Sequence, residues 1–408
     1  MQILITGADG FIGKNLLLHL AERKDVQVVC FTRAHDVAQL PVLLQSGDFV
    51  FHLAGVNRPQ DPAEFVTGNV GLTKALCQAV GVVALTTGKK VPIVYTSSAQ
   101  ADRDNAYGAS KLAAENALFA LQHAHGVPVH IFRLPNVFGK WCKPNYNSAV
   151  ATFCHNVARG LPIQVNDPAA SMTLVYVDDV VACFIRLCER SAASQEVGDM
   201  DCRASLAMTE GTLAMTETET ETETWAGTET GAGTEVSPQY STTVGEVARL
   251  IQSFKASRDT LMTERVGTGL VRALYSTYVS YLPVEAFTYT VPQHADPRGV
   301  FVEMLKTPDA GQFSYFTAHP GITRGGHYHH SKTEKFLVIK GQARFKFRHM
   351  QTGQTHELVT TGDKPEVVET VPGWTHDITN IGSDEMVVML WANEVFDRAR
   401  PDTFACAV

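Results

Sequence analysis

The chain has 408 residues, which is enough for two or three domains with hydrophobic cores of their own. Its 42 acidic and 34 basic residues give a formal net charge of −8, and no basic stripe interrupts that balance, so we expect no nucleic-acid-binding surface. Eight cysteines are scattered without a CxxC pair, which indicates a reducing compartment rather than a disulfide framework.

The first 190 residues alternate short apolar runs with segments of helical pattern. The apolar runs are QILIT, VQVVCF, DFVFHLAG, PIVYTSS and VHIFRL, and between them lie helical stretches such as residues 14–23, 66–80 and 110–123. This alternation predicts an α/β domain with a doubly wound parallel sheet of the Rossmann type. No window approaches roughly 18 uninterrupted apolar residues, and no apolar segment precedes the first run. We therefore expect no signal peptide, no membrane span and a cytoplasmic location.

A glycine-rich turn directly follows the first apolar run. GADGFIG has Gly7, Gly10 and Gly13 between QILIT and the helical stretch that starts near Lys14. Such glycines allow a tight turn and a close approach to a pyrophosphate, which then lies at a helix N-terminus. The spacing is GxxGxxG rather than GxGxxG, and the alternative is a glycine turn without a ligand. The strand before it and the helix after it favour a dinucleotide site.

The end of the second apolar run bears on which dinucleotide binds. The run ends in FTR, without a carboxylate that would hold a ribose 2′-hydroxyl, and Arg33 stands at that place. An arginine there pairs with a 2′-phosphate, so NADP(H) is favoured over NAD, and the alternative is a solvated surface arginine. Arg33 and Asp48 are close in the sequence, so we expect the third strand to be curtailed.

The stretch YTSSAQADRDNAYGASK combines a strand-ending serine with a YxxxK pattern. Tyr107 and Lys111 are four residues apart and share one helix face. A cation beside a tyrosine favours the phenolate, so Tyr107 is suited to transfer the proton that accompanies hydride transfer. Ser98 would hydrogen-bond the carbonyl oxygen of the substrate. Many helices contain YxxxK by chance, so the serine and the upstream glycine turn are the supporting signals.

The motifs TGADGFIG, FHLAG, YTSSA, YGASK, RLPNVFG and VYVDDV, taken in this order, resemble the successive signatures of the extended short-chain dehydrogenases/reductases that act on nucleotide sugars. The resemblance covers about residues 1–282. Family members that remove water from the sugar use an Asp-Glu pair that is absent here, because Ala99 and Gln100 follow Ser98. A simple reductase or an epimerase is therefore favoured over a dehydratase. The resemblance implies cofactor contacts from Gly7, Gly10, Phe11, Ile12, Gly13, Arg33, Leu53, Ala54, Tyr107, Lys111 and Pro135.

A low-complexity insertion interrupts this first domain at about residues 206–236. LAMTEGT is followed by the near-duplicate LAMTETE and then by TETETETWAGTETGAGTE. The alternating Thr and Glu residues offer no apolar face, and the glutamates repel one another. We expect a solvated, mobile insertion that arose by tandem duplication and has no function, with a docking role as the alternative. After it, residues 243–255 resume a helical pattern.

From about Phe287 the sequence consists of short strands separated by Gly, Pro or Asp, which predicts an all-β barrel or sandwich over residues 287–408. In GITRGGHYHHSKTEKFLVIKG, His327 and His329 are two residues apart and therefore face the same side of a strand. Glu334 can return from the next strand, and His376 in PGWTHDITN is a fourth candidate ligand. Three histidines and a carboxylate suit zinc, iron, manganese or nickel.

This second region resembles the cupin family. Its histidine-rich stretch matches the first cupin motif, G(x)5HxH(x)4E(x)6G, at every position. The second motif is matched at its glycine, His376 and Asn380, while the proline lies one place off. His330 would point to the opposite face and is left out of the ligand set. The resemblance implies a divalent metal, zinc before the others, and the alternative is a vacant or sugar-only pocket.

Both regions together resemble the bifunctional capsular-polysaccharide and O-antigen enzymes that make UDP-2-acetamido-2,6-dideoxy-L-talose on the route to UDP-N-acetyl-L-fucosamine. YSTYVSYLP, DPRGVFVEMLKTPDAGQ and NEVFDRARPDT extend this resemblance across the junction and the tail. It implies that the cupin epimerises a UDP-4-keto-6-deoxy amino sugar at C3, that the first domain reduces the C4 ketone with NADPH, and that the chain forms a homodimer. The base of the epimerisation stays open among His330, Lys332, Lys335 and Asp377.

Three other interpretations are weighed against this one. The first is a sugar 4-epimerase with tightly held NAD+ and a structural cupin, which Arg33 disfavours. The second is a non-catalytic NADP-dependent sensor or scaffold, which has no use for the Ser98, Tyr107 and Lys111 set. The third is an iron oxygenase in the cupin.

Overall fold

The computed structural model describes residues 1–61, 63–146, 148–207, 235–296, 299–302, 305, 311–394 and 399–408. Most of the Thr/Glu insertion that the sequence singles out lies outside the described residues. The contacts divide the chain into two compact units: the first comprises Met1–Ala8, Lys24–Leu134 and Ala182–Val236, and the second comprises Asp9–Arg23, Pro135–Val181 and Ser237–Val408. The predicted domain limits, residues 1–282 and 287–408, stay a prediction.

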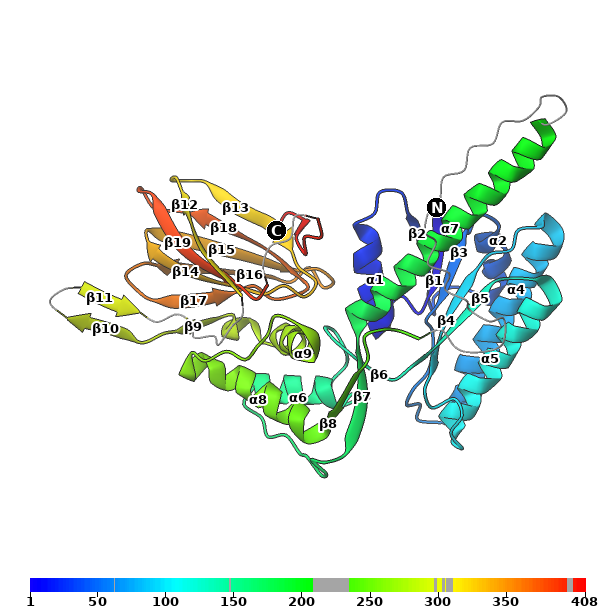
Figure 1. Ribbon diagram of the computed structural model, residues 1–408, viewed down its shortest axis with the longest axis horizontal. Helices are drawn as coiled ribbons and strands as arrows, with labels where there is room; N and C mark the ends of the chain where they lie inside the picture. Colours follow the sequence, from blue (N-terminus) through cyan, green and yellow to red (C-terminus); the bar gives the residue numbers. More distant parts are fainter. Residues whose placement is uncertain are drawn as a thin grey trace, which may run out of the picture. The chain divides into compact units, whose positions relative to one another are not determined.

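The first unit is built on a five-stranded parallel sheet, which confirms the predicted Rossmann-type architecture (Figure 1). Its strands follow the apolar runs of the sequence closely. In sheet order they are β2 (Gln27–Phe31), β1 (Gln2–Thr6), β3 (Phe49–His52), β4 (Ile93–Ser98) and β5 (Val129–Leu134). The described segment 34–48 contains no strand, because a 3-10 turn, η1 (Val37–Gln39), and the short helix α2 (Leu40–Gln45) connect β2 to β3.

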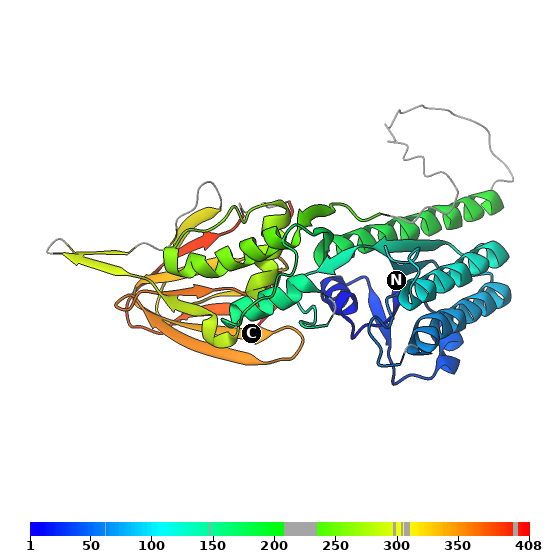
Figure 2. The ribbon, with the colours of Figure 1, turned by 90° about the horizontal axis from the view of Figure 1, so that it is seen from below.

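Helices cover both faces of this sheet. On one face, α4 (Leu72–Thr87) and α5 (Ala106–His125) lie side by side in both views (Figures 1 and 2). On the other face, Phe184 of α7 (Val177–Ala207) packs against Phe51 and Phe132 of the strands. The turns α3 (Ala63–Phe65) and η2 (Val66–Gly71), the latter a π-helical turn, lead into α4.

One helical run within the described residues, Ala63–Thr87, is long and apolar enough to cross a membrane by length and composition alone. Its residues Leu76, Val80 and Val83 are buried in the core of the first unit, where they pack with strand residues such as Ile93. This is the packing of a core helix.

Before the all-β region, the described residues of the second unit form a small mixed sheet, four complete helices and the first turn of α7. The sheet has the order β6 (Asn136–Phe138), β7 (Ser171–Tyr176) and β8 (Tyr240–Thr243). The helices are α1 (Phe11–Ala21), α6 (Ala149–Ala158), α8 (Val244–Thr260) and α9 (Gly269–Ser280). Helix α8 starts where the sequence predicts, because the Thr243 hydroxyl accepts from the amide of Glu246 as an N-cap. The first six residues of YSTYVSYLP form the end of α9, which ends at Ser280.

The second unit also contains the predicted all-β region, which consists of two five-stranded antiparallel sheets and a hairpin. One sheet has the order β12 (Gln312–Ala318), β19 (Met386–Ala392), β14 (Glu334–Lys340), β17 (Glu366–Glu369) and β9 (Thr288–Thr290). The other has the order β16 (Thr355–Thr361), β15 (Gln342–His349), β18 (Trp374–Asn380), β13 (Thr323–Tyr328) and β20 (Phe404–Ala405). The 3-10 turn η3 (Val284–Ala286) precedes β9, and β10 (Gln293–Asp296) pairs with β11 (Gly299–Val302).

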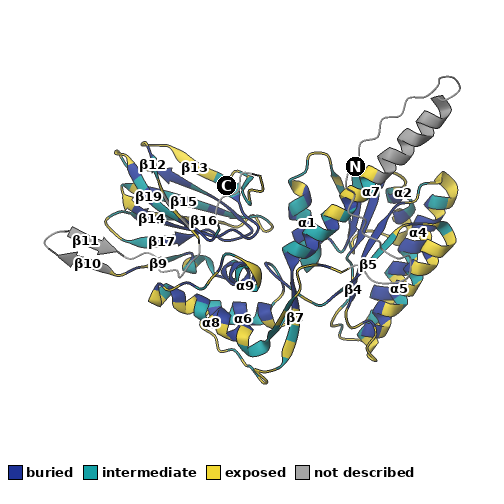
Figure 3. Cartoon of the chain, viewed as in Figure 1, coloured by how far each residue is buried: buried dark blue, intermediate teal, exposed yellow. Residues whose placement is uncertain are grey.

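The core of the second unit runs without a break from the helices into the barrel (Figure 3). Ile251 and Phe254 of α8 belong to the same buried cluster as Val338 and Val367 of the barrel strands. A buried ion cluster reinforces this contact, because Glu369 of β17 pairs with Arg258 of α8 through one oxygen and with Lys335 of β14 through the other. The barrel is therefore fixed on α8 by apolar and charged contacts together.

Candidate functional site

The glycine turn after β1 requires a glycine at its first position. Gly7 adopts a φ of +73°, and a Cβ there would lie 2.5 Å from the amide nitrogen of Ala54 and 2.8 Å from the carbonyl carbon of Leu53, so only glycine fits. Helix α1 begins at Phe11, and its N-cap, Gly10, provides no side-chain acceptor. The first amides of the helix are thereby left for an anionic ligand such as a pyrophosphate.

The other predicted cofactor residues lie at the ends of strands or in the first turn of α1. Arg33 is exposed, two residues beyond the end of β2. Phe11 and Ile12 are half-buried, and Gly13 is buried. Pro135 is half-buried between β5 and β6. Their contacts with a cofactor stay a prediction.

The predicted relay residues come from β4 and the helix that follows it. Ser98 ends β4 and is buried, and its Oγ accepts from the amide of Gln100 at 3.1 Å. Tyr107 lies half-buried in the first turn of α5. Lys111 is buried one turn further on, where its Nζ donates to the carbonyl of Thr96 at 2.8 Å and lies 6.0 Å from the centroid of the Tyr107 ring.

Burial lowers the pKa of the Lys111 side chain toward neutral pH. Desolvation lowers its pKa to about 8, against the opposing influence of the Glu115 carboxylate, which raises it. The amine is therefore mainly protonated at neutral pH. It supplies a buried positive charge beside Tyr107, which is the electrostatic role that the YxxxK pattern predicts.

Two residues that the sequence analysis did not single out hold the relay segments together. A Cβ at Gly108 would lie 2.3 Å from the carbonyl oxygen of Gln100, so glycine lets the loop after Ser98 pack directly on α5. The Nδ2 of buried Asn69 donates to Ser110 Oγ at 2.9 Å and thereby ties η2 to α5. Gly108 follows Tyr107 in the YGASK motif, so a local signal existed for it, whereas nothing in the sequence marked Asn69.

A third such residue, Glu115, anchors α5 to the sheet. Its carboxylate is buried, accepts a hydrogen bond from Ser97 and forms a two-pronged pair with Arg133 of β5. Ser97 directly precedes Ser98, and Glu115 lies one helical turn after Lys111. A buried, bidentate carboxylate at this place fixes the relay helix against the strand that carries the serine.

The structure brings the four predicted metal ligands together inside the barrel. His327 lies near the end of β13, His329 follows that strand, Glu334 begins β14 and His376 is central in β18. One ligand atom from each of the four side chains lies within 4.8 Å of the corresponding atom of every other. The ring centroids of the three histidines are 4.7 to 5.3 Å apart.

A β-bulge in β13 contributes to this convergence. Gly325 pairs with Asp377 and His327 pairs with His376, so Gly326 is an extra residue on β13. Gly325 has a φ of +95°, and a Cβ there would lie 3.0 Å from the carbonyl oxygen of His376. Bulges of this kind re-aim the following side chains, here the two histidines of the HxH motif.

The donor set fits a divalent metal. His376 is buried, and neither of its ring nitrogens has a hydrogen-bond partner among the described residues. Desolvation, helped by neighbouring histidines, lowers the pKa of His327 to about 4, so its nitrogen carries a free lone pair at neutral pH. Burial alone would raise the pKa of Glu334, but His329 holds it well below its usual range. Neutral imidazole and a carboxylate are ordinary zinc ligands.

The four side chains that were candidates for the base of the epimerisation have different surroundings in the structure. Lys332 contacts the ligand set, with its Nζ 2.7 Å from Glu334 Oε1. His330 turns its ring toward Glu22, and Lys335 pairs with Glu369. Asp377 follows His376 on β18 and so points to the opposite face of the strand.

Two family models match the chain: the NAD dependent epimerase/dehydratase family over residues 3–201 and the polysaccharide biosynthesis C-terminal domain over residues 294–404. A UDP-2-acetamido-2,6-beta-L-arabino-hexul-4-ose reductase of Pseudomonas aeruginosa is 57% identical over 408 residues, which is 100% of this chain and 99% of that protein. UDP-glucuronic acid decarboxylase 3 of Arabidopsis thaliana is 27% identical over 229 residues, 46% of this chain and 66% of that protein.

Among solved structures, the capsular polysaccharide assembling protein CapF of Staphylococcus aureus has a TM-score of 0.60 at 40% identity, with 100% of both chains covered. A second CapF structure, with the inhibitor 3-isopropenyl-tropolone, has a TM-score of 0.57 at 36% identity with the same coverage. The similarity therefore extends through the Rossmann-type sheet and the barrel alike. The chain belongs to the NAD dependent epimerase/dehydratase family, among the members that continue into a polysaccharide biosynthesis C-terminal domain.

Proposed function

We propose that the chain is a bifunctional nucleotide-sugar enzyme of capsule or O-antigen precursor synthesis. Its cupin epimerises a UDP-4-keto-6-deoxy-HexNAc at C3, and its first domain reduces the C4 ketone with NADPH to UDP-2-acetamido-2,6-dideoxy-L-talose. The observation that carries this proposal is the 57% identity to a reductase of a UDP-activated hexul-4-ose, because it spans both regions of the chain.

The relay residues have a defined part in the reduction. When bound, NADPH would supply the hydride for C4. The Tyr107 hydroxyl donates its proton to the C4 oxygen, which turns the ketone into an alcohol, and the Ser98 hydroxyl orients that oxygen by a hydrogen bond. The buried ammonium of Lys111, 6.0 Å from the Tyr107 ring centroid, stabilises the negative charge left on the phenol oxygen.

The choice of NADPH over NAD rests on the tip of β2. Arg33 is exposed there and provides a cation where members that prefer NAD have a carboxylate. A guanidinium pairs with a 2′-phosphate through two parallel hydrogen bonds. Comparing the rates with NADPH and NADH for the wild type and for Arg33→Ala measures this contribution. Loss of the NADPH preference in the variant is the expected result.

The metal-ligand set has its part in the epimerisation. His327, His329, Glu334 and His376 would hold a divalent metal, zinc by this proposal, which would supply Lewis acidity to the sugar carbonyl. Transfer of the C3 proton to a base and delivery of a solvent-derived proton to the other face of C3 would invert that carbon without net oxidation. The ammonium of Lys332, 2.7 Å from Glu334 Oε1, adds positive charge next to the place where the enolate forms.

We further propose a cytoplasmic homodimer without a nucleic-acid or membrane partner. The faces of α4 and α5 carry exposed apolar side chains, among them Leu85 at 75% exposure and Phe119 at 38%, which a second copy of the chain would cover. Scattered free cysteines suit a reducing compartment. Sedimentation equilibrium of the wild type and of Leu85→Lys measures the assembly, and a monomeric variant is expected.

Mass spectrometry of the product tests the two chemical steps together. The protein is incubated with UDP-4-keto-6-deoxy-HexNAc and NADPH in deuterated water, and the expected product carries deuterium at C3 and a reduced C4. Reduction without label at C3 would contradict the epimerase assignment. Isomerisation at C4 with added NAD+ and no consumption of NADPH would instead identify a 4-epimerase, and consumption of oxygen would identify an oxygenase.

A further inference from the structure

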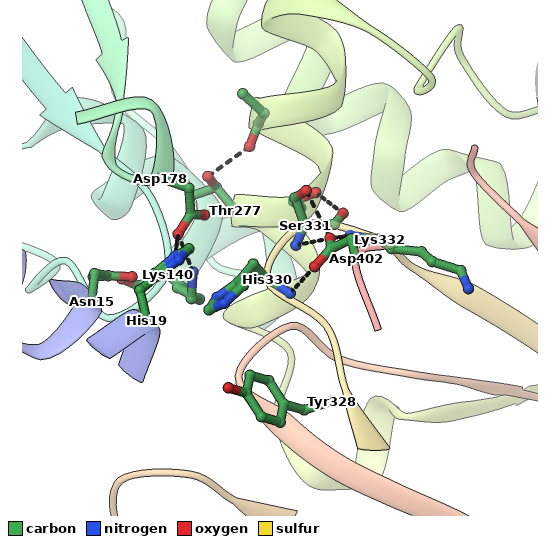
Figure 4. A network of polar contacts seen from close by, with 12 residues as sticks. Asn15, His19, Lys140, Asp178, Thr277, Tyr328, His330, Ser331, Lys332 and Asp402 are labelled. Carbon is green, nitrogen blue, oxygen red and sulfur yellow. Dashed lines mark hydrogen bonds and ion pairs between the residues drawn. The ribbon is translucent and has the colours of Figure 1, made fainter. Parts of the chain in front are cut away.

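The segment that leads from the end of β13 to the first residue of β14, residues 329–334, carries two of the four predicted metal ligands and is held by residues from distant parts of the chain. We call it the ligand loop. One partner is Asp402 in the C-terminal tail, and the other is Glu22, just after α1. Figure 4 shows Asp402 beside the ligand loop and His19 of α1 beside His330.

Asp402 holds the backbone of the ligand loop. Its Oδ1 accepts from the amide of His330 at 2.8 Å, and its Oδ2 accepts from the amides of Ser331 at 2.8 Å and Lys332 at 2.7 Å. The Ser331 hydroxyl donates to the same Oδ2 at 3.0 Å. Three successive amides that converge on one carboxylate form an anion-binding nest, which fixes the backbone conformation between His329 and Glu334.

The main chain of Asp402 also orients a metal ligand directly. The ring nitrogen Nδ1 of His329 lies 2.5 Å from the Asp402 carbonyl oxygen. A carbonyl oxygen only accepts, so Nδ1 carries a proton and Nε2 is the nitrogen turned toward the other predicted ligands. Nε2 is the atom that faces Glu334 Oε2, at 3.1 Å. A ligand histidine with its other nitrogen fixed in this way is typical of metal centres.

Glu22 holds the other side of the same segment. Its Oε1 accepts from Tyr328 Oη at 2.5 Å and from the Nε2 of His330. The ring of His19 stacks on His330 with centroids 3.4 Å apart and an interplanar angle of 6°. Tyr328 and His330 alternate with His327 and His329 along the chain, so Glu22 holds the outward face while the ligands face the barrel interior.

His19, Asp178 and His330 lie close enough together to hold a metal, because one ligand atom of each lies within 4.8 Å of a ligand atom of the other two. The buried ammonium of Lys140 lies 2.6 Å from Asp178 Oδ1 and already neutralises that carboxylate. A divalent cation there would meet a fixed positive charge. The group therefore serves as an anchor for His330 and not as a second metal centre.

We propose that Asp402 and Glu22 are positioning residues of the metal centre, a role that rests on the proposed function of the cupin. Asp402 sets the backbone of the ligand loop, and Glu22 sets its outward side chains. Metal affinity in this protein then depends on the C-terminal tail and on the residue after α1, and not only on the two cupin motifs.

The affinity of the full-length protein for zinc tests this proposal. Zinc dissociation constants are measured by competition with a chromophoric chelator for the wild type, Asp402→Asn and Glu22→Gln. The matched controls are Asp384→Asn and Glu385→Gln, which change exposed carboxyl groups of the same barrel. In Asp402→Asn the new amide group faces backbone donors, so zinc affinity is expected to fall by about 10- to 100-fold. Glu22→Gln is expected to lose roughly tenfold or less, because it acts on the outward face only.

The visible spectrum of the cobalt-substituted protein separates positioning from a general loss of stability. A displaced ligand changes the d–d bands of cobalt, whereas a merely destabilised barrel lowers the unfolding temperature and keeps the bands. Changed bands in both variants, with unchanged bands in the controls, are the expected result. If Asp402→Asn fails to fold, the isosteric Glu22→Gln variant carries the test alone.

Two outcomes would overturn the proposal, and they are distinguishable. Zinc affinities within twofold of the wild type and unaltered cobalt bands in both variants would remove the positioning role and leave the proposed metal site standing. A wild-type protein that binds no zinc or cobalt would remove the metal site and the positioning role together.

Discussion

Ser98, Tyr107 and Lys111 come from one strand and the helix that follows it, whereas the predicted metal ligands come from three strands in two different sheets and from the segment after β13. All three predicted relay residues therefore lie within β4, α5 and the short loop between them. The metal-ligand set needs a bulge in β13, the ligand loop, β18 and two distant carboxylates. The same chain thus contains a locally encoded site and a site that depends on contacts far apart in the sequence.

Tyr107→Phe is expected to have the largest effect and to separate the two sites. The variant lacks the proton donor, so NADPH oxidation falls by about 10²- to 10⁴-fold. Exchange of solvent deuterium into the keto sugar continues, because it depends on the barrel. Stopped-flow absorbance of NADPH and mass spectrometry of the sugar measure the two steps.

Tyr315→Phe is the matched control for this substitution, since Tyr315 is 73% exposed on the barrel. Reduction by Tyr107→Phe at the wild-type rate would show that another group donates the proton.

His327→Ala is expected to have the opposite effect. Loss of one imidazole weakens the metal site, and deuterium exchange into the sugar falls by about 100-fold or more, because Lewis-acid stabilisation of the enolate is lost. The relay is intact, so a substrate supplied already as the C3 epimer is still reduced. The control is His319→Ala, at an exposed histidine near the end of β12. Equal loss of both steps in His327→Ala would show that the two sites do not act separately.

The difference between the two sites also explains which of their residues could be predicted from the sequence. Spacings of a few residues define the glycine turn, the relay and the HxH motif. The periodicity of strands and helices then predicts which of these residues face the same side. Glu22 lies 308 residues from His330, and Asp402 lies 72 residues from it, so no local pattern marks these two contacts. Nearness in sequence was also a poor guide, because Lys335, next to Glu334, is paired with Glu369 and not with the ligand set.

The connection between β2 and β3 also could not be predicted from a local sequence pattern. The apolar runs predicted the five parallel strands, and the short distance from Arg33 to Asp48 predicted a curtailed third strand, but neither pattern indicated that η1 and α2 would connect β2 to β3. That connection depends on how Leu40 and Leu44 pack into the core of the first unit. The sequence pattern contains the apolar residues but not their partners.

Lys111 gives a pH-dependent test of the locally encoded site. Desolvation lowers its pKa from 10.5 in the unfolded chain to about 8 in the folded protein. The destabilisation is fully present below pH 8 and is relieved as the pH rises from about 8 to about 10.5, because in that window the unfolded chain binds more protons. The Lys111 contribution to the free energy of unfolding is expected to rise by up to about 3 kcal/mol.

Urea unfolding of the wild type and of Lys111→Met at pH 8 and pH 10 measures that contribution. The difference in the free energy of unfolding between the two proteins isolates the contribution of Lys111 from those of the tyrosines and cysteines that also titrate in this pH range. If this free-energy difference is the same at both pH values, Lys111 is not desolvated in the folded protein. The proposed electrostatic role of Lys111 beside Tyr107 would then be wrong.

We expect the Thr/Glu insertion to serve neither site and its removal to have the smallest effect of these changes. Residues 209–234 are replaced by a short Gly/Ser linker, while Val236 is kept because it is buried in the first unit. A sequence without an apolar face is not expected to contribute to a core, so NADPH oxidation and deuterium exchange are both expected within twofold of the wild type. A folded deletion variant that loses one of the two activities would give the insertion a functional role and would identify which of the two sites it serves.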